Sequence, residues 1–173
     1  MTRIAVAYLF EGAAAERLNK LRRTYDPESA ATVDAHVTLA APIEWNGTTA
    51  DAADVLTELL RSEQAFELTV DGVGTFLPAS PTCFAVVGPR ARLTALHDLI
   101  VAHLGSKERW PFVPHATICE YLTPERTAEV VKKLQPMPLH FQCHVDSVSL
   151  LRQVKGTRWQ PIHELPLGGT IRK

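Results

Sequence analysis

The sequence has no excess of charge of either sign. Among 173 residues, 18 Lys and Arg stand against 19 Asp and Glu, which gives a formal net charge of -1 at pH 7. A chain without a strong positive field is poorly suited to hold a long nucleic-acid backbone. We therefore expect no groove for long nucleic acid, and we expect any bound phosphate to be small or to be one end of a longer chain.

Cysteine is scarce, and long apolar runs are lacking. The three cysteines, Cys83, Cys119 and Cys143, are odd in number and scattered, which favours a reducing compartment over a disulfide framework. The N-terminal apolar run stops at Glu11, and no run approaches the roughly 20 residues that a membrane-spanning helix requires. These features predict a cytoplasmic protein without a membrane partner. Nothing in them demands more than a monomer.

What the sequence does contain is a repeat within one domain of ordinary composition, 46% hydrophobic and 21% charged. The strand-like runs "RIAVAYL" and "TCFAVV" each begin 33 residues before a histidine, His36 and His115 respectively. Further on, "FELTVDGV" from Phe66 and "FQCHVDSV" from Phe141 share the pattern F-x-x-x-V-D-x-V. Two similar halves, approximately 1–78 and 79–173, are therefore expected.

Helical periodicity falls at matching places in the two halves. Apolar residues recur at helical spacing in "AAERLNKLRR", in "RLTALHDLIVAHL" and in the stripe Ala52, Val55, Leu56, Leu59 and Leu60. Thr123 and Pro124 suit the start of a fourth helix. The pattern predicts an α+β fold of two pseudo-symmetric lobes. Each lobe is an antiparallel sheet with helices packed outside, strand exchange between lobes is allowed, and a central cleft lies between them.

A histidine and a threonine two places apart recur in two apolar strands, "HVTL" at His36 and "HATI" at His115. Of the seven histidines, only these two have a threonine two places on. Successive side chains of a strand point to opposite faces, so His36 and Thr38 share a face, as do His115 and Thr117. In a pseudo-symmetric molecule the two pairs should converge on one cleft.

Two opposed imidazoles suit phosphoryl transfer, because one can accept a proton while the other donates one. Threonine hydroxyls can donate hydrogen bonds to phosphate oxygens without burying further charge. A single histidine on an apolar strand is more often a satisfied core residue. Equivalent positions in a repeat favour the functional interpretation.

The paired motifs "HVTL" and "HATI" resemble the H-x-T-x motifs of the 2H phosphoesterase superfamily. The most similar branch is that of the bacterial 2′-5′ RNA ligase-like proteins, also called RNA 2′,3′-cyclic phosphodiesterases. The resemblance covers nearly the whole chain, including the "VDGVGTF" strand. It implies a metal-independent hydrolase of 2′,3′-cyclic or 2′-5′ phosphodiesters, acting on a small cyclic nucleotide or an RNA terminus. In reverse, such an enzyme forms a 2′-5′ linkage.

By this resemblance, His36 is the proton donor to the leaving sugar oxygen and His115 the acceptor that activates water, while Thr38 and Thr117 hold the phosphate. The sequence departs from the pattern at one point. Many members carry an arginine soon after the second motif, whereas "HATICEYLTPER" offers Glu120 first and Arg126 only later. The second motif therefore lacks the nearby arginine that would clamp the phosphate. Arg152 is a candidate substitute, although a solvated surface arginine is the more common interpretation of such a residue.

Other residues suggest other sites and functions. Trp110, Phe112 and Phe84 are candidates for stacking a nucleobase, although core packing explains them equally well. In "HFQCH", His140 and His144 share a strand face that Cys143 does not, which opposes a zinc site. No acidic residue shares the face of either H-x-T pair, so no metal and no cofactor are expected. The alternatives are a non-catalytic nucleotide or RNA-end binding module and a metal-dependent hydrolase.

Overall fold

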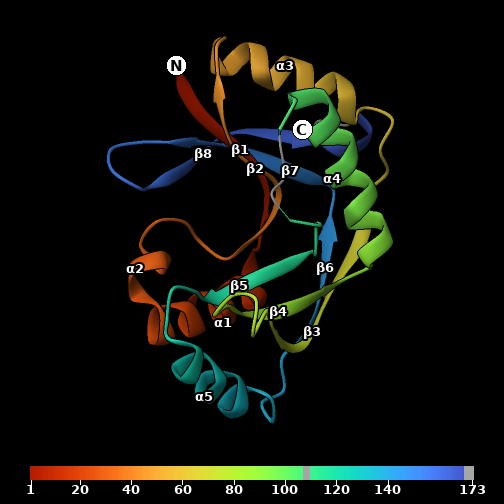
Figure 1. Ribbon diagram of the computed structural model, residues 1–173. Coiled ribbons are helices and arrows are strands. Elements are labelled where there is room, and N and C mark those ends of the chain that lie inside the picture. Colours follow the sequence, from red (N-terminus) through yellow and green to blue (C-terminus); the bar gives the residue numbers. More distant parts are fainter. Residues whose placement is uncertain (107–109, 170–173) are drawn as a thin grey trace.

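Two four-stranded antiparallel sheets form the frame of the molecule, a computed structural model that describes residues 1–106 and 110–169. The first sheet has the order β2 (His36–Trp45), β1 (Thr2–Leu9), β7 (Ser147–Gln153) and β8 (Trp159–Pro166). The second has the order β5 (His115–Cys119), β4 (Cys83–Gly88), β3 (Phe66–Thr75) and β6 (His140–Val145). Figure 1 shows the sheets as two layers of strands. The expected α+β class is confirmed.

The helices lie on the outside of these sheets (Figure 1). In chain order they are α1 (Gly12–Tyr25), α2 (Pro27–Ala30), α3 (Thr49–Leu60), α4 (Arg90–Leu104) and α5 (Pro124–Leu134), followed by the 3-10 turn η1 (Leu167–Gly169). Helix α1 contacts β5 of the second sheet, and α4 contacts β2 of the first. Each half of the chain thus packs a helix against the histidine strand of the other half.

The two copies of the F-x-x-x-V-D-x-V repeat pair with each other. Strands β3 and β6 run antiparallel with Phe66 opposite Val145 and Val70 opposite Phe141. Leu68 lies opposite Cys143, its equivalent in the second copy. This register is unchanged when the copies are exchanged, as a local two-fold axis requires. The repeat in the sequence is therefore a symmetry element of the fold.

Strands cross between the two halves. Strand β3 belongs to the first half of the chain but pairs with β4, while β7 belongs to the second half and pairs with β1. Each sheet consequently contains strands from both halves, so the sheets are not two contiguous segments of sequence. The exchange joins the halves through backbone hydrogen bonds.

Most of the expected helical stripes are buried, with one exception. Ala14, Leu18 and Leu21 of α1 are in the core. In α3, however, Val55 is 36% exposed and Ala53 is buried instead, which shifts the apolar face around the helix. The start of α5 follows the expectation, because the Thr123 side chain accepts a hydrogen bond from the N–H of Arg126.

The two histidine strands alternate between core and cleft. Val37 and Leu39 on β2, and Ala116 and Ile118 on β5, have no exposed surface. The histidines and threonines between them are half-buried and lie on the opposite faces. Burying the apolar face thus sets the direction of the four candidate site side chains. Within the ranges that the structure describes, no helix is long and apolar enough to cross a membrane.

Candidate active site

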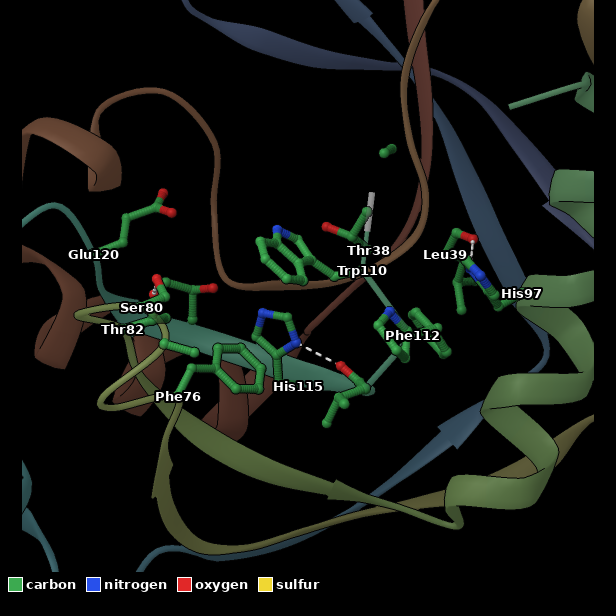
Figure 2. Close-up of a pocket in the computed structure, with 15 residues that line it drawn as sticks. Thr38, Leu39, Phe76, Ser80, Thr82, His97, Trp110, Phe112, His115 and Glu120 are labelled. Atoms are coloured by element: carbon green, nitrogen blue, oxygen red, sulfur yellow. Dashed lines mark hydrogen bonds between the residues drawn. The ribbon is translucent and has the colours of Figure 1, made fainter. Parts of the chain in front are cut away.

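A cavity of about 780 Å³ is lined by residues of β2 and β5, one strand from each sheet. Thr38 of β2 and His115 and Thr117 of β5 are among its lining residues (Figure 2). His36 begins β2 and is not one of the lining residues, although its ring is close enough for the charge of His115 to affect its pKa. The structure therefore brings the four expected residues into one region.

The two imidazoles are held in the same way. Nδ1 of His36 lies 2.8 Å from the carbonyl oxygen of Asp34, and Nδ1 of His115 lies 2.6 Å from that of Val113. In each case the carbonyl belongs to the residue two places before the histidine. A carbonyl can only accept, so Nδ1 carries the proton in both rings. Nε2 is then the nitrogen left to exchange a proton with a ligand.

Both histidines are neutral at pH 7 in the protein alone. The pKa of His36 is lowered from 6.5 to about 4, chiefly by burial; the nearby charges of Arg22 and His115 also lower it, and the hydrogen bond to the Asp34 carbonyl opposes them. Burial also lowers the pKa of His115, against the hydrogen bond to Val113. An anion between the rings would raise both pKa values, because it stabilises the imidazolium form.

Aromatic side chains set the position of the His115 ring. Phe76 meets it edge to face with 4.9 Å between centroids, and Phe84 lies tilted at 5.3 Å. The two phenylalanine rings are themselves 4.4 Å apart. This packing, together with the carbonyl contact, restricts both torsions of the imidazole, which is the requirement for directional proton transfer.

One end of the cavity is aromatic. Phe112 stacks on His97 with 3.8 Å between centroids and 4° between planes, and His97 is held by the Leu39 carbonyl at 2.8 Å. Trp110 also lines the cavity and is 69% exposed (Figure 2). Of the three stacking candidates, Trp110 and Phe112 therefore lie in the cavity, whereas Phe84 packs behind His115.

The other end carries hydroxyls and a carboxylate. Figure 2 shows Ser80, Thr82 and Glu120 on the side of His115 away from Phe112. The hydroxyls of Ser80 and Thr82 are 2.9 Å apart. Burial raises the pKa of Glu120, as does the charge of Asp26. Among the lining residues that the structure describes, none is Lys or Arg.

The two arginines considered from the sequence lie elsewhere. Arg126 on α5 is exposed and forms an ion pair with Glu129 at 2.8 Å. Arg152 on β7 is exposed as well, and neither lines the cavity. The buried cation near the site is Arg22 of α1, which is 2% exposed. The sequence feature that could have identified Arg22 as buried is its position four residues after Leu18, on the apolar face of the helix.

Residues with metal-binding chemistry do not gather in the described part of the chain. No group of three or more His, Cys, Asp or Glu side chains there could hold a metal ion. His140 and His144 of β6 instead face acidic partners on β3, Asp71 at 3.5 Å and Glu67 at 2.6 Å. The segment is a strand with cross-strand polar pairs, as its alternation indicated.

The fold defines a two-lobed α+β protein in which the two histidine strands, β2 and β5, line one cavity. Residues 10–157 match the model of the 2′-5′ RNA ligase superfamily, and the chain belongs to this family. "Putative phosphoesterase OB1230" of Oceanobacillus iheyensis is 27% identical over 155 residues, which span 88% of this chain and 91% of that protein. "Putative phosphoesterase BCB4264_A1283" of Bacillus cereus strain B4264 is 30% identical over 151 residues, which span 86% of this chain and 87% of that protein.

Solved structures share the whole fold. Escherichia coli LigT complexed with 3′-AMP superposes with a TM-score of 0.66 at 21% identity, covering 96% of this chain and 98% of its own. TT0787 of Thermus thermophilus superposes with a TM-score of 0.68 at 17% identity, covering 96% of this chain and 98% of its own. The expected resemblance is confirmed for family and fold.

Proposed function

We propose that the cleft hydrolyses 2′,3′-cyclic or 2′-5′ phosphodiesters of nucleotides or RNA ends, by general acid-base catalysis without a metal. The observation that carries this proposal is the matched pair of imidazoles, both held through Nδ1 by the carbonyl two residues before. Two rings with the same tautomer offer two Nε2 atoms for a proton relay. A core histidine has no reason to repeat this arrangement in the other half of the chain.

The proposed reaction moves two protons and breaks one bond. A water oxygen attacks phosphorus while its proton passes to Nε2 of His115. The bond from phosphorus to the 3′ oxygen breaks, and that oxygen takes a proton from Nε2 of His36. The products are a 2′-phosphate and a free 3′ hydroxyl. The donor and acceptor roles are those that the family resemblance implies.

Binding of the phosphate is part of the proposed chemistry. Thr38 and Thr117 line the cavity and can donate hydroxyl hydrogen bonds to the non-bridging oxygens. The negative phosphate would raise the pKa of His36, which is about 4 in the protein alone, toward the range in which it carries a proton. The substrate thereby helps to create the acid that the reaction uses.

The ligands of the structural neighbours support a small nucleotide substrate. LigT has been crystallised with 3′-AMP, with NADP+, with ATP and with phosphate. The names of the curated relatives support phosphoester chemistry. In this chain the aromatic end of the cavity, with Phe112 and Trp110, offers a surface for the base, and the hydroxyl end offers donors for phosphate or sugar.

The alternative is a module that binds nucleotides or RNA ends without turnover. The neutral state of both histidines in the protein alone favours it, because neither ring is an acid until an anion binds. Incubation with 2′,3′-cyclic AMP in the presence of EDTA separates the candidates. The proposed enzyme releases 2′-AMP, a binding module gives a complex without product, and a metal-dependent hydrolase is silent until metal is restored.

Histidine variants test which residues act. His36→Ala and His115→Ala should each lower the rate by about 10² to 10⁴ if the rings are acid and base. His103 is exposed on α4, so His103→Ala is a matched control that should keep the wild-type rate. A His115→Ala protein with an unchanged rate would remove this residue from the mechanism.

The leaving group distinguishes the acid from the base. A nitrophenyl phosphodiester expels a stable anion that needs little protonation, so loss of the general acid matters less for it. If His36 is the donor, His36→Ala recovers most of its lost rate on this substrate while His115→Ala does not. The opposite pattern would exchange the two roles.

A further inference from the structure

The guanidinium of Arg22 connects the segments that carry the two histidine motifs. It donates to the carbonyl of Thr117 at 2.7 Å, on the strand of the second motif. It also donates to the carbonyls of Ser29 and Val33, both at 3.1 Å, in the segment that precedes the first motif. One buried side chain of α1 therefore fixes backbone from both halves of the chain.

The segment that Arg22 holds is the one that orients His36. Val33 is followed directly by Asp34, whose carbonyl accepts from Nδ1 of His36. The side chain of Asn19, also on α1, accepts from the next backbone N–H, that of Ala35, at 2.7 Å. Movement of this segment would move the Asp34 carbonyl and with it the ring. Helix α1 thus controls the orientation of a histidine that lies outside the helix.

Arg22 is also a fixed charge beside the cleft. Burial lowers its pKa, and the charges of Glu120, Asp26 and Asp34 oppose this effect and keep the guanidinium charged. Its Nε has no hydrogen-bond partner within the described residues. Burying a guanidinium with one unpaired donor costs folding free energy. A neutral side chain with hydrogen-bond donors could join the two backbone segments without burying a charge.

We propose that Arg22 is a positioning residue of the active site, which sets the His36 segment and strand β5 relative to each other and supplies a positive charge behind the phosphate position. It acts through the carbonyls of Thr117 and Val33. The inference rests on the proposed function, since a cleft that binds no phosphate has no use for the charge. The proposed charge of Arg22 would also explain how phosphate can bind in a cavity among whose described lining residues none is Lys or Arg.

The charge has a measurable effect on His36. The charged and titratable groups that face this ring are Arg22, Asp34 and His115. Arg22 disfavours the imidazolium, so its removal should raise the pKa of His36. Loss of the carbonyl contacts would act on this pKa in Arg22→Lys and in Arg22→Met alike, whereas loss of the charge acts in Arg22→Met alone. Histidine titration followed by NMR therefore separates the electrostatic role from packing, and it does not depend on turnover.

Three variants make the test. Arg22→Met removes charge and hydrogen bonds, Arg22→Lys keeps the charge but cannot reach three carbonyls, and Arg23→Met changes the exposed neighbour on the same helix. Arg22→Met should raise the pKa of His36 and lower kcat by about a hundredfold, since small misplacements of catalytic groups cost this much. Arg22→Lys should keep the low pKa and lower kcat by about tenfold. Arg23→Met should match the wild type in both.

The outcomes that overturn the proposal are equally definite. A folded Arg22→Met protein that titrates and turns over like Arg23→Met would show that Arg22 has neither role. If Arg22→Met does not fold, Arg22→Lys decides, and a wild-type kcat in that variant would refute the positioning role. Circular dichroism and thermal unfolding establish which case applies.

Failure of the proposed function gives a different pattern. If the wild-type protein turns over no cyclic phosphate, the hydrolase is refuted, but the His36 titrations of Arg22→Lys and Arg22→Met still report on the charge. If the pKa of His36 then rises in Arg22→Met alone, Arg22 is the charge that lowers this pKa, and the cleft has a function other than hydrolysis. An equal titration in all four proteins would refute the inference by itself.

Discussion

Gly74 leaves the space that the ring of Phe84 occupies on the neighbouring strand. The two residues lie directly opposite each other in β3 and β4, and a methyl group on Gly74 would lie 2.7 Å from Cε2 of Phe84. The same ring packs against His115 with 5.3 Å between centroids. A residue without a side chain therefore permits the contact that positions a candidate catalytic imidazole.

Substitution of Gly74 should disturb catalysis through Phe84. In Gly74→Ala the phenyl ring must move, and a displaced His115 should lower kcat by about tenfold. Steady-state kinetics with a cyclic phosphate measure this loss of kcat. Gly88→Ala is the control, because its new methyl would meet Thr69 Oγ1 at 3.3 Å and not the Phe84 ring.

A double-mutant cycle checks the route of this effect. In a Phe84→Leu background the smaller side chain leaves room, so Gly74→Ala should lower kcat much less than it does alone. Equal losses in the two backgrounds would mean that the glycine acts on the site by another path.

The tautomer of both histidines is a direct expectation from the geometry. Burial keeps His36 and His115 neutral at pH 7, and each Nδ1 faces a carbonyl oxygen, so the single ring proton should lie on Nδ1 in both. Nitrogen-15 chemical shifts of the labelled rings report which nitrogen is protonated. A neutral His115 ring with its proton on Nε2 would contradict the proposed relay, because that nitrogen could not accept a proton from water.

Local patterns in the sequence were sufficient to predict the direction of the candidate site side chains. Strand alternation places Val37 and Ala116 in the core, so the flanking His and Thr side chains must face the cleft. Helical periodicity located α1, α3, α4 and α5 for the same reason, since burial of one face leaves a period in the sequence.

Pairing between distant segments could not be predicted in this way. The alternation of apolar and polar side chains along β3 is the same whether this strand pairs with β4 or with β1. The pattern therefore allowed strand exchange without establishing it. The part played by Arg22 was missed because its partners are three backbone carbonyls, and a carbonyl has no signature in the sequence. The placement of Glu120 beside the site depends on the same long-range packing.

Stability should decrease at low pH because of His36. Its pKa is about 4 in the folded protein and 6.5 in an unfolded chain, so below pH 6.5 the unfolded state binds a proton that the folded state does not. The free energy of unfolding therefore decreases as the pH falls from 6.5 toward 4, by at most about 3 kcal/mol for this group.

A variant that lacks the titrating ring isolates this contribution. Urea unfolding at pH 7 and at pH 4.5 should show a smaller loss of stability for His36→Gln than for the wild type. The exposed His103 provides the control, since His103→Gln should follow the wild-type curve. Identical losses in all three proteins would show that the folded-state pKa of His36 is not depressed.

Asp26 ties the end of strand β5 to helix α2, and its loss should affect both stability and activity. One carboxylate oxygen accepts from the N–H of Ser29 at 3.0 Å and the other from the N–H of Glu120 at 2.9 Å. Asp26→Asn keeps the shape but offers only one acceptor atom, which leaves one partly buried N–H without a partner and should cost about 1 kcal/mol. Urea unfolding measures this cost against Asp54→Asn, a change at an exposed site on α3. Because β5 carries His115, kcat should fall in the Asp26 variant as well, and equal stability and kcat in the two variants would show that this connection is not needed.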